Sequence, residues 1–228
     1  MLTATQTDSQ TPGDTGEEPF GERQTAVLEA ALALLVEGGD KGFTTARLAR
    51  AANCSKESLY KWFGDRNGLL AAMITYQASK VRVAGSSDAK PSADGFRRQL
   101  TGFARDLLTV LSGATSLALN RLAIGEAGRE DAQLGHLLIE RGRRAIEQRA
   151  KRLLDAGKTA GLIRFGDREE AFNTLYGLIV GDLHVRMLLG DAVPLLTGTD
   201  GIGAQAARAI NQFLRLYEAA DSSRTINT

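Results

Sequence analysis

The stretch Thr44-Thr-Ala-Arg-Leu-Ala-Arg-Ala-Ala-Asn-Cys-Ser-Lys-Glu-Ser-Leu-Tyr-Lys-Trp-Phe63 predicts two short helices joined by a tight turn. Thr44 or Thr45 can cap the first helix and Ser55 the second, because their hydroxyls accept hydrogen bonds from the free N–H groups of a first turn. Asn53 stands at the turn, where the left-handed backbone is one that few residues besides Gly, Asn and Asp adopt cheaply. This arrangement is typical of a helix-turn-helix unit.

The residue types in this stretch separate into a packing set and a polar set. Ala49 is small where the two helices cross, and the apolar residues that lock the pair are Leu48, Cys54, Leu59 and Phe63. The second helix keeps its other positions available to a DNA major groove: Ser55, Lys56, Glu57, Ser58, Tyr60 and Lys61. Trp62 is interpreted as a packing anchor rather than a stacking platform for bases, and Tyr60 can be either a phosphate contact or a partly buried packing residue.

The charge around this stretch is basic, although the 228-residue chain has a net charge of only +1. Residues 41–66 hold six basic residues against two acidic ones: Lys41, Arg47, Arg50, Lys56, Lys61 and Arg66 against Glu57 and Asp65. A local basic patch is the electrostatic footprint of a surface that binds phosphates.

Helical periodicity extends outward on both sides and predicts an all-α fold. A first helix is stopped by Gly38-Gly39, and Asp65 can cap a helix that begins at Arg66. Beyond a loop at 85–94, further helices are expected over 95–112, 115–127, 131–157, 168–190 and 201–219. The predicted organisation is a disordered tail (1–19), a three-helix helix-turn-helix domain (20–70), a larger helical domain (71–220) and a flexible tail (221–228).

Composition and motifs argue against several classes of protein. The single cysteine, Cys54, excludes an internal disulfide framework and fits a core position in a reducing cytoplasm. His136 and His184 have no accompanying cysteine or carboxylate cluster, so no metal site is expected. The sequence contains no Ser-His-Asp or nucleotide-binding motif, no secretory signal and no apolar run long enough to span a bilayer. We therefore expect no catalytic residue, no cofactor and no association with a membrane.

Over its first four predicted helices the chain resembles the TetR family of transcriptional regulators. The match comprises Ala30-Ala31-Leu32, Glu37-Gly38-Gly39, Phe43-Thr44-Thr45, Leu48-Ala49-Arg50-Ala51-Ala52, Ser55-x-x-x-Leu59-Tyr60-x-x-Phe63, and Asp65-Arg66 before Leu69-Leu70. Asn53-Cys54 stands where the family usually has Gly-Val, and Lys61-Trp62 stands where His or Tyr is frequent. Asn accepts the same backbone shape and Cys is a small hydrophobe, so both are compatible with the fold.

The resemblance implies roles for residues of the helix-turn-helix domain. Thr45 and Arg47 would contact the DNA backbone or the groove edge. The residues placed for base edges, just after Ser55, are Lys56, Glu57 and Ser58, and those placed for phosphates are Tyr60, Lys61 and Arg66. A carboxylate such as that of Glu57 is repelled by DNA unless it accepts a hydrogen bond from a cytosine amino group.

For the larger domain, the resemblance implies a homodimer that binds a near-palindromic operator in double-stranded DNA and releases it when a small, largely apolar effector binds. Candidate effector-binding residues are Phe103, Leu107, Asn120, Arg121, Tyr176, Ile179 and His184. In the family the last two long helices pair with their symmetry mates, which assigns the dimer interface to Leu183, Met187, Ile210, Phe213, Leu214 and Tyr217. The alternative is that these apolar faces pack within one subunit.

Two other functions stay open from the sequence alone. One is an all-α enzyme, which requires convergent polar groups that the sequence shows only in isolation. The other is a DNA-binding protein that is constitutive, activates transcription or answers to a protein partner; a cavity in the larger domain would instead favour an effector-released repressor. The basic stretch 140–158 is interpreted as a solvated face, since Glu140–Arg144 and Glu147–Lys151 form favourable i,i+4 pairs opposite an apolar stripe. The expected location is the cytoplasm.

Overall fold

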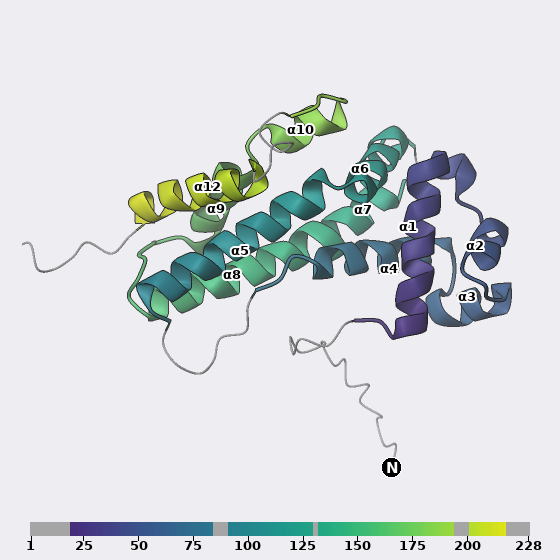
Figure 1. Ribbon diagram of the computed structural model, residues 1–228, viewed down its shortest axis with the longest axis horizontal. Helices are drawn as coiled ribbons and strands as arrows, with labels where there is room; N and C mark the ends of the chain where they lie inside the picture. Colours follow the sequence, from purple (N-terminus) through teal and green to yellow (C-terminus); the bar gives the residue numbers. More distant parts are fainter. Residues whose placement is uncertain (1–18, 84–90, 130–131, 194–200, 218–228) are drawn as a thin grey trace, which may run out of the picture.

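The computed structural model describes residues 19–83, 91–129, 132–193 and 201–217, and within these ranges it contains helices and no strand. The predicted all-α fold is therefore confirmed. The first four helices are α1 (Glu22–Gly42), α2 (Thr45–Ala51), α3 (Lys56–Phe63) and α4 (Arg66–Ser79), and they gather at one end of the molecule (Figure 1). The expected tails, 1–19 and 221–228, lie outside the described residues except for Pro19.

The remaining helices form the larger, C-terminal part of the chain (Figure 1). They are α5 (Ala93–Ser112), α6 (Ala114–Glu126), α7 (Leu134–Leu137), the π-helical turn η1 (Leu138–Arg143), α8 (Arg144–Thr159), α9 (Arg168–Val180), α10 (Leu183–Leu188) and α12 (Gly201–Tyr217). The single helix expected over 168–190 is wrong. Gly181 adopts φ 48° and ends α9, and α10 begins two residues later.

Local sequence determines where the helices of the helix-turn-helix domain begin. The cap of α2 is Thr44, whose hydroxyl accepts a hydrogen bond from the backbone N–H of Arg47 at 3.3 Å. Ser55 caps α3 in the same way, and Asp65 caps α4. Asn53 has φ 47°, which confirms the left-handed turn predicted between α2 and α3.

The buried apolar side chains form two cores that share one helix. The first core joins α1–α4 to Leu119 and Ala123 of α6 and to Leu134 of α7. The second core lies among α5, α8, α9 and α12, and its largest fully buried side chains are Phe96, Phe103, Phe172 and Phe213. Helix α4 contributes to the first core through most of its length and to the second through Ala78, so the boundary expected at residue 70 falls inside a continuous helix.

Helix α12 packs against α5 and α9 of its own subunit (Figure 1). As a result, five of the six side chains assigned to a dimer interface are buried inside the subunit: Leu183, Met187, Ile210, Phe213 and Leu214. The sixth, Tyr217, is half-buried, stacks on Phe213 with ring centroids 4.7 Å apart and donates a hydrogen bond to Thr174 at 3.1 Å. The apolar stripe of α12 therefore packs mainly against its own subunit.

Among the described helices, none is by itself long and apolar enough to cross a membrane. Only α5 and α6 taken together, bent by 60° at their junction, match such a span in length and composition.

Candidate DNA-binding face and ligand pocket

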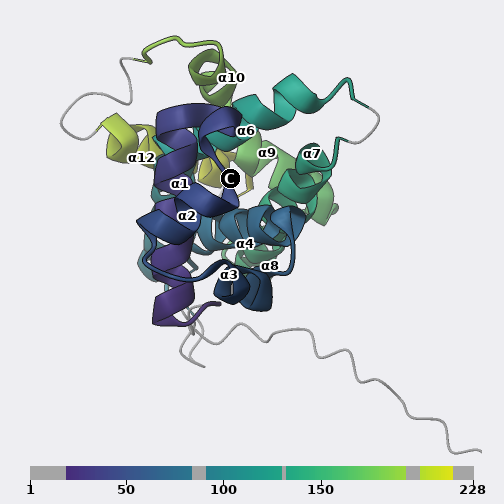
Figure 2. The same cartoon turned by 90° about the vertical axis from the view of Figure 1, so that its right-hand side faces the viewer.

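Helix α3 has a polar outer face, and its inner face is anchored in the first core. Leu59 and Phe63 are buried in the first core, whereas Lys56, Glu57 and Lys61 are exposed and Tyr60 is 57% exposed. At the start of the helix the Ser55 hydroxyl accepts a hydrogen bond from the Ser58 backbone N–H at 3.0 Å, and the two hydroxyls lie 3.1 Å apart. Figure 2 views this end of the molecule with α1, α2 and α3 toward the reader. The outer face of α3 thus carries hydroxyls, ammonium groups, a carboxylate and a phenol. These side chains are called the polar row: Ser55, Lys56, Glu57, Ser58, Tyr60 and Lys61.

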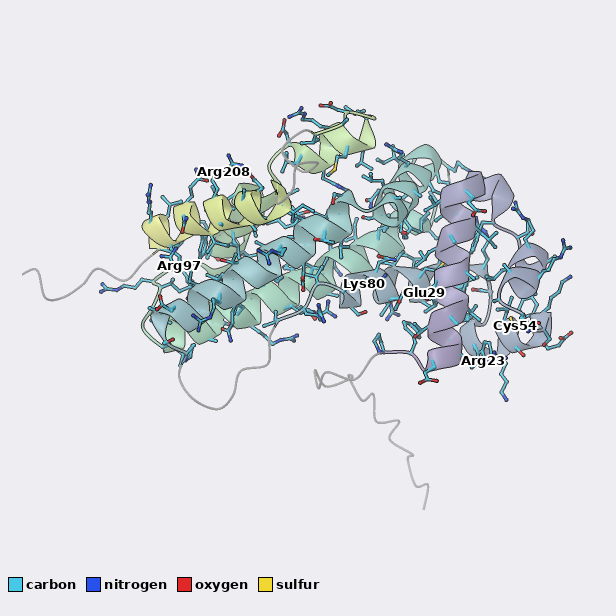
Figure 3. All side chains as sticks on the ribbon, in the orientation of Figure 1. Arg23, Glu29, Cys54, Lys80, Arg97 and Arg208 are labelled. Carbon is cyan, nitrogen blue, oxygen red and sulfur yellow. The ribbon has the colours of Figure 1, made fainter. Side chains whose placement is uncertain are left out.

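Two side chains of this stretch have packing roles, as predicted. Trp62 is half-buried beside the first core and meets Phe63 edge-on, with ring centroids 6.3 Å apart. Cys54 is partly buried where α2 and α3 meet (Figure 3), also against the first core. Neither residue belongs to the polar row on α3.

Candidate contacts also lie beside α3, on α2 and α4. Thr45 is half-buried, while Arg47 is exposed and its guanidinium lies close to the backbone of Gly42 at the end of α1. Arg66, the first residue of α4, places its guanidinium 5.9 Å from the ring centroid of Phe43. Basic side chains thus occur on the helix before α3 and on the helix after it, and contacts of basic side chains with phosphates are what positions a protein on DNA.

Glu57 is the one acidic side chain in the polar row. Its pKa is lowered, first by a hydrogen bond with its own backbone N–H and second by the Ser55 hydroxyl. The carboxylate is therefore ionised at neutral pH and tied to the helix start. In that state it can accept a hydrogen bond from a base amino group but repels phosphate.

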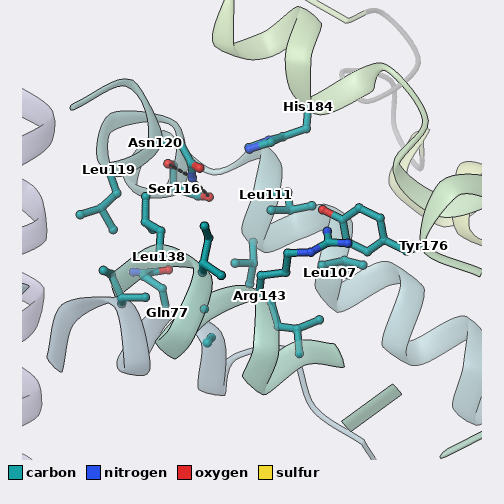
Figure 4. A pocket seen from close by; sticks show the side chains of 16 residues that line it. Gln77, Leu107, Leu111, Ser116, Leu119, Asn120, Leu138, Arg143, Tyr176 and His184 are labelled. Carbon is teal, nitrogen blue, oxygen red and sulfur yellow. Dashed lines mark hydrogen bonds between the residues drawn. The ribbon is translucent and has the colours of Figure 1, made fainter. Parts of the chain in front are cut away.

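A pocket of about 210 Å³ lies between the shared helix α4 and the C-terminal part of the chain (Figure 4). Its apolar lining consists mainly of Ile74, Leu107, Val110, Leu111, Leu119, Leu138, Ile139 and Ile146. The polar lining consists of Gln77, Ser116, Asn120, Arg143, Tyr176 and His184. The space is several times the roughly 30 Å³ share of one water molecule, so it can hold a small organic molecule.

Four of the seven candidate effector-binding residues line this pocket: Leu107, Asn120, Tyr176 and His184. Phe103 and Ile179 do not line it and are fully buried in the second core. Arg121 is not part of the lining either, because its guanidinium donates hydrogen bonds to the carbonyls of Met187 and Leu188 on α10, at 2.7 and 3.1 Å.

Sequence reasoning missed the contribution of α4 and η1 to the pocket. Ile74 and Gln77 carry no signal beyond ordinary helical periodicity. Arg143 belongs to the basic stretch interpreted as a solvated face, and the two predicted ion pairs of that stretch do form, each at 2.5 Å. The π-helical turn shifts the helical register at 138–143, and a search for a period of 3.6 residues could not detect this shift.

The polar groups of the pocket differ in how well they are satisfied. The Asn120 amide donates to the Ser116 carbonyl at 2.8 Å and is thus engaged within α6. His184 Nδ1 is buried without a hydrogen-bond partner among the described residues. Burial lowers the pKa of His184, and a hydrogen bond with the Leu111 carbonyl opposes that effect in part. The described residues contain no cluster of three His, Cys, Asp or Glu side chains that could hold a metal ion.

A helix-turn-helix with an exposed polar helix, joined through α4 to a larger all-helical domain, defines a DNA-binding transcriptional regulator. The chain matches a profile of the tetR family of bacterial regulatory proteins over residues 27–73. It matches a second profile, for the C-terminal domain of AefR-like transcriptional repressors, over residues 98–219. The chain belongs to the TetR family of transcriptional regulators.

Solved structures agree with this assignment. A TetR transcriptional regulator from Agrobacterium tumefaciens is 56% identical, with 88% of this chain and 97% of that chain covered and a TM-score of 0.75. The flavonoid-responsive regulator FrrA is 25% identical, with 89% of this chain and 100% of that chain covered and a TM-score of 0.62. A TetR-family structure from Mesorhizobium loti, 23% identical over 86% of this chain and 96% of that chain with a TM-score of 0.67, shares the fold. No curated protein matches the chain.

Proposed function

We propose that this regulator is a repressor that a small, largely apolar effector releases from its operator. The observation that carries the proposal is the position of α4. This helix begins next to the recognition helix α3 and, further along, lines the pocket with Ile74, Gln77 and Ala78. A molecule that enlarges or closes the pocket therefore acts on the helix that supports the DNA-binding face.

Two hydrogen bonds support transmission through α4. Tyr76 Oη donates to Glu29 Oε1 at 2.7 Å, which joins α4 to α1. Arg149 on α8 donates to the carbonyl of Ala78 at 2.6 Å, which joins the end of α4 to the C-terminal part of the chain. A shift of α8 relative to α5 would pull on α4 and thereby change the placement of α3. Coupling of this kind is typically worth about 1–3 kcal/mol.

The nature of the effector follows from the pocket lining and from one relative. Apolar side chains predominate and a few polar groups are available to orient a ligand, as in most small-molecule sites. The name of FrrA states that this relative responds to flavonoids, which supports a small effector for this chain as well. The family assignment favours this function over an all-α enzyme. The proposed location is the cytoplasm, because a bacterial regulator acts where the chromosomal DNA is.

A homodimer is part of the proposal, because a single helix-turn-helix unit binds DNA weakly. The two-fold axis of a dimer also matches the symmetry of a near-palindromic site. Since the apolar stripe of α12 is buried, the second copy would contact the exposed positions of that helix: Ala204, Ala207, Arg208, Asn211, Gln212, Arg215 and Leu216. Sedimentation should show a dimer at micromolar concentration and a weaker one for Leu216→Glu. A monomeric wild-type protein would refute this part.

The experiment for the function is selection of bound duplexes from a random pool, followed by release with small molecules. We expect enrichment of a near-palindromic site with half-sites ~34 Å apart. A reporter promoter that overlaps the site should be repressed. Leu111→Trp fills the pocket, so it should either prevent small molecules from releasing the DNA or weaken DNA binding without any small molecule. Ile124→Trp, on the exposed side of α6, should have neither effect. Release by the same molecules from both variants alike would refute the pocket as the effector site.

A further inference from the structure

One cation in the pocket has no counter-charge. On the neighbouring turns of the same helical segment, Arg144 pairs with Glu140 and Lys151 pairs with Glu147. Arg143 forms no ion pair with any carboxylate of the described residues. Instead, its guanidinium lies over the ring of Tyr176, 4.6 Å from the centroid (Figure 4), and 5.9 Å from the centroid of Phe172.

The backbone presents Arg143 to the pocket. Arg143 is the last residue of the π-helical turn η1, and four residues of that turn line the pocket: Leu138, Ile139, Gly142 and Arg143. A π-helical turn has less favourable hydrogen bonding than an α-helix and occurs preferentially at functional sites. Here the wider turn brings both apolar side chains and the guanidinium into one lining.

A second polar group in the same lining is unsatisfied. His184 Nδ1 is buried and has no hydrogen-bond partner among the described residues, while the ring interacts with the Leu111 carbonyl. Because burial lowers the pKa of His184, the imidazole is neutral at physiological pH. A neutral imidazole whose other nitrogen donates to a carbonyl presents Nδ1 as an acceptor. A hydroxyl group of a ligand would satisfy it.

We propose that the pocket binds a small amphipathic acid, whose anionic oxygen group pairs with Arg143 and whose hydroxyl, where present, donates to His184 Nδ1. This inference rests on the proposed function, because it names the class of molecule that occupies the same pocket. The apolar body of the ligand would lie against Leu107, Leu111 and Ile146.

The physical reason for an acid rather than a neutral molecule is desolvation. Arg143 is exposed in the structure, and a ligand that fills the pocket would remove water from the side of the guanidinium that faces it. A cation that loses water without gaining a counter-charge is unfavourable. A carboxylate or phenolate restores the charge balance and forms charge-assisted hydrogen bonds, which are about twice as strong as neutral ones. The Tyr176 ring, stacked on the same guanidinium, keeps it oriented toward the pocket.

Calorimetry with matched pairs of probes tests the proposal on the full chain. The aromatic pair is para-hydroxycinnamate and its carboxamide, and the aliphatic pair is octanoate and octanamide. In the wild-type protein we expect at least one acid to bind about tenfold or more tightly than its amide. Arg143→Gln should reduce that ratio to about one, and Arg143→Lys should leave an intermediate ratio because charge persists without the planar fork. Arg144→Gln, the adjacent arginine outside the pocket, should keep the full ratio.

A separate pair of ligands tests the proposed hydrogen bond from a ligand hydroxyl to His184 Nδ1. Para-hydroxycinnamate should bind about fivefold more tightly than cinnamate in the wild-type protein, the scale of one net hydrogen bond. His184→Phe should remove this difference, whereas His136→Phe, an exposed histidine on α7, should not. The proposal is overturned if neither acid binds at millimolar concentration, if the amides bind as tightly as the acids, or if the preference for acids survives Arg143→Gln.

Failure of this inference and failure of the proposed function have different signatures. If neutral compounds bind in the pocket and release DNA while acids do not bind, the ligand class is wrong and the repressor proposal stands. If acids bind in an Arg143-dependent manner and DNA affinity never changes, the ligand class stands and the release mechanism is wrong.

Discussion

The DNA-binding face and the ligand pocket are held in shape by different kinds of interaction. Helices α2, α3 and α4 each begin at a side-chain cap: Thr44, Ser55 and Asp65. Among the helices that line the pocket, α5 and α9 also begin at side-chain caps, Ser92 and Asp167, whereas α6 and α10 have none. The first region is therefore defined by neighbours in sequence, whereas the part of the pocket formed by α6 and α10 depends on contacts between distant segments, such as the bonds of Arg121 to α10.

This contrast has a consequence for motion. A helix whose first turn is capped resists local fraying, whereas an uncapped helix depends on packing that a ligand can rearrange. The molecule thus combines a preformed candidate DNA-binding face with a pocket in which the part formed by α6 and α10 can adjust. Substitutions can show whether the two regions are mechanically joined and whether they differ in local stability.

The largest effect is expected from a cavity in the second core. Phe213 is fully buried, so Phe213→Ala should lower the free energy of unfolding by about 3–5 kcal/mol. Because α4 belongs to both cores, the loss should also appear in the helix-turn-helix domain. The only tryptophan, Trp62, lies in that domain, and its fluorescence should report the same urea midpoint as far-UV circular dichroism. A Trp62 midpoint unchanged by Phe213→Ala would show that the two regions unfold independently.

A smaller effect is expected at the junction of α3 and α4. A Cβ at Gly68 would lie 1.9 Å from the carbonyl oxygen of Phe63, which is backbone and cannot rotate away. Gly68→Ala should therefore destabilise the protein by about 1–3 kcal/mol and weaken DNA binding, because α3 must shift relative to α4. Gly102→Ala on α5 is the matched control: its Cβ meets nothing within 4 Å, and the change should stabilise the helix by about 0.5–1 kcal/mol. Equal thermal shifts for the two variants would contradict the model of a tight α3–α4 junction.

The caps themselves should contribute less. Asp65 Oδ1 accepts a hydrogen bond from the Gly68 backbone N–H at 2.8 Å, so Asp65→Ala should cost about 1 kcal/mol in chemical unfolding. Asp65→Asn keeps an acceptor at the same position and should cost only a few tenths. If both variants lose the same stability, the charge of Asp65 rather than its cap is responsible.

The smallest effect on stability, within about 0.5 kcal/mol, is expected at exposed Lys61. Lys61→Ala should nevertheless weaken binding to all DNA sequences alike and reduce the slope of log affinity against log salt by about one. Lys56→Ala should instead change base preference at one position of the selected site. Arg141→Ala, in the basic stretch far from α3 in sequence, is the control and should leave the salt slope unchanged. A slope that Lys61→Ala does not alter would remove Lys61 from the phosphate contacts.

The sequence predicted the helix-turn-helix domain more accurately than the C-terminal part, for the same physical reason. Caps and a left-handed turn are local signals, so Ser55, Asp65 and Asn53 could be interpreted from their immediate neighbours. The break at Gly181 was missed because the apolar pattern of α9 continues across it into α10.

Other features of the C-terminal part depend on long-range packing. The apolar stripe containing Ile210 and Phe213 was visible in the sequence, but its spacing is the same whether the stripe faces its own subunit or a second one. The contribution of Arg143 to the pocket depends on a π-helical turn, which no residue type announces. Asn120, Tyr176 and His184, which line the pocket, stood out because few polar or aromatic residues occur in otherwise apolar helices.

The continuity of α4 sets a rule for building hybrid regulators from this chain. A splice at residue 70, between the expected domains, would cut a helix in the middle and divide the first core between two parents. A junction at Gly64, before the Asp65 cap, would keep α4 with its pocket but give the donor helices a foreign partner. Leu119 and Ala123 of α6 must then fit the incoming α1, so these two positions are the ones to redesign when the specificity of one regulator is transplanted onto the ligand response of another.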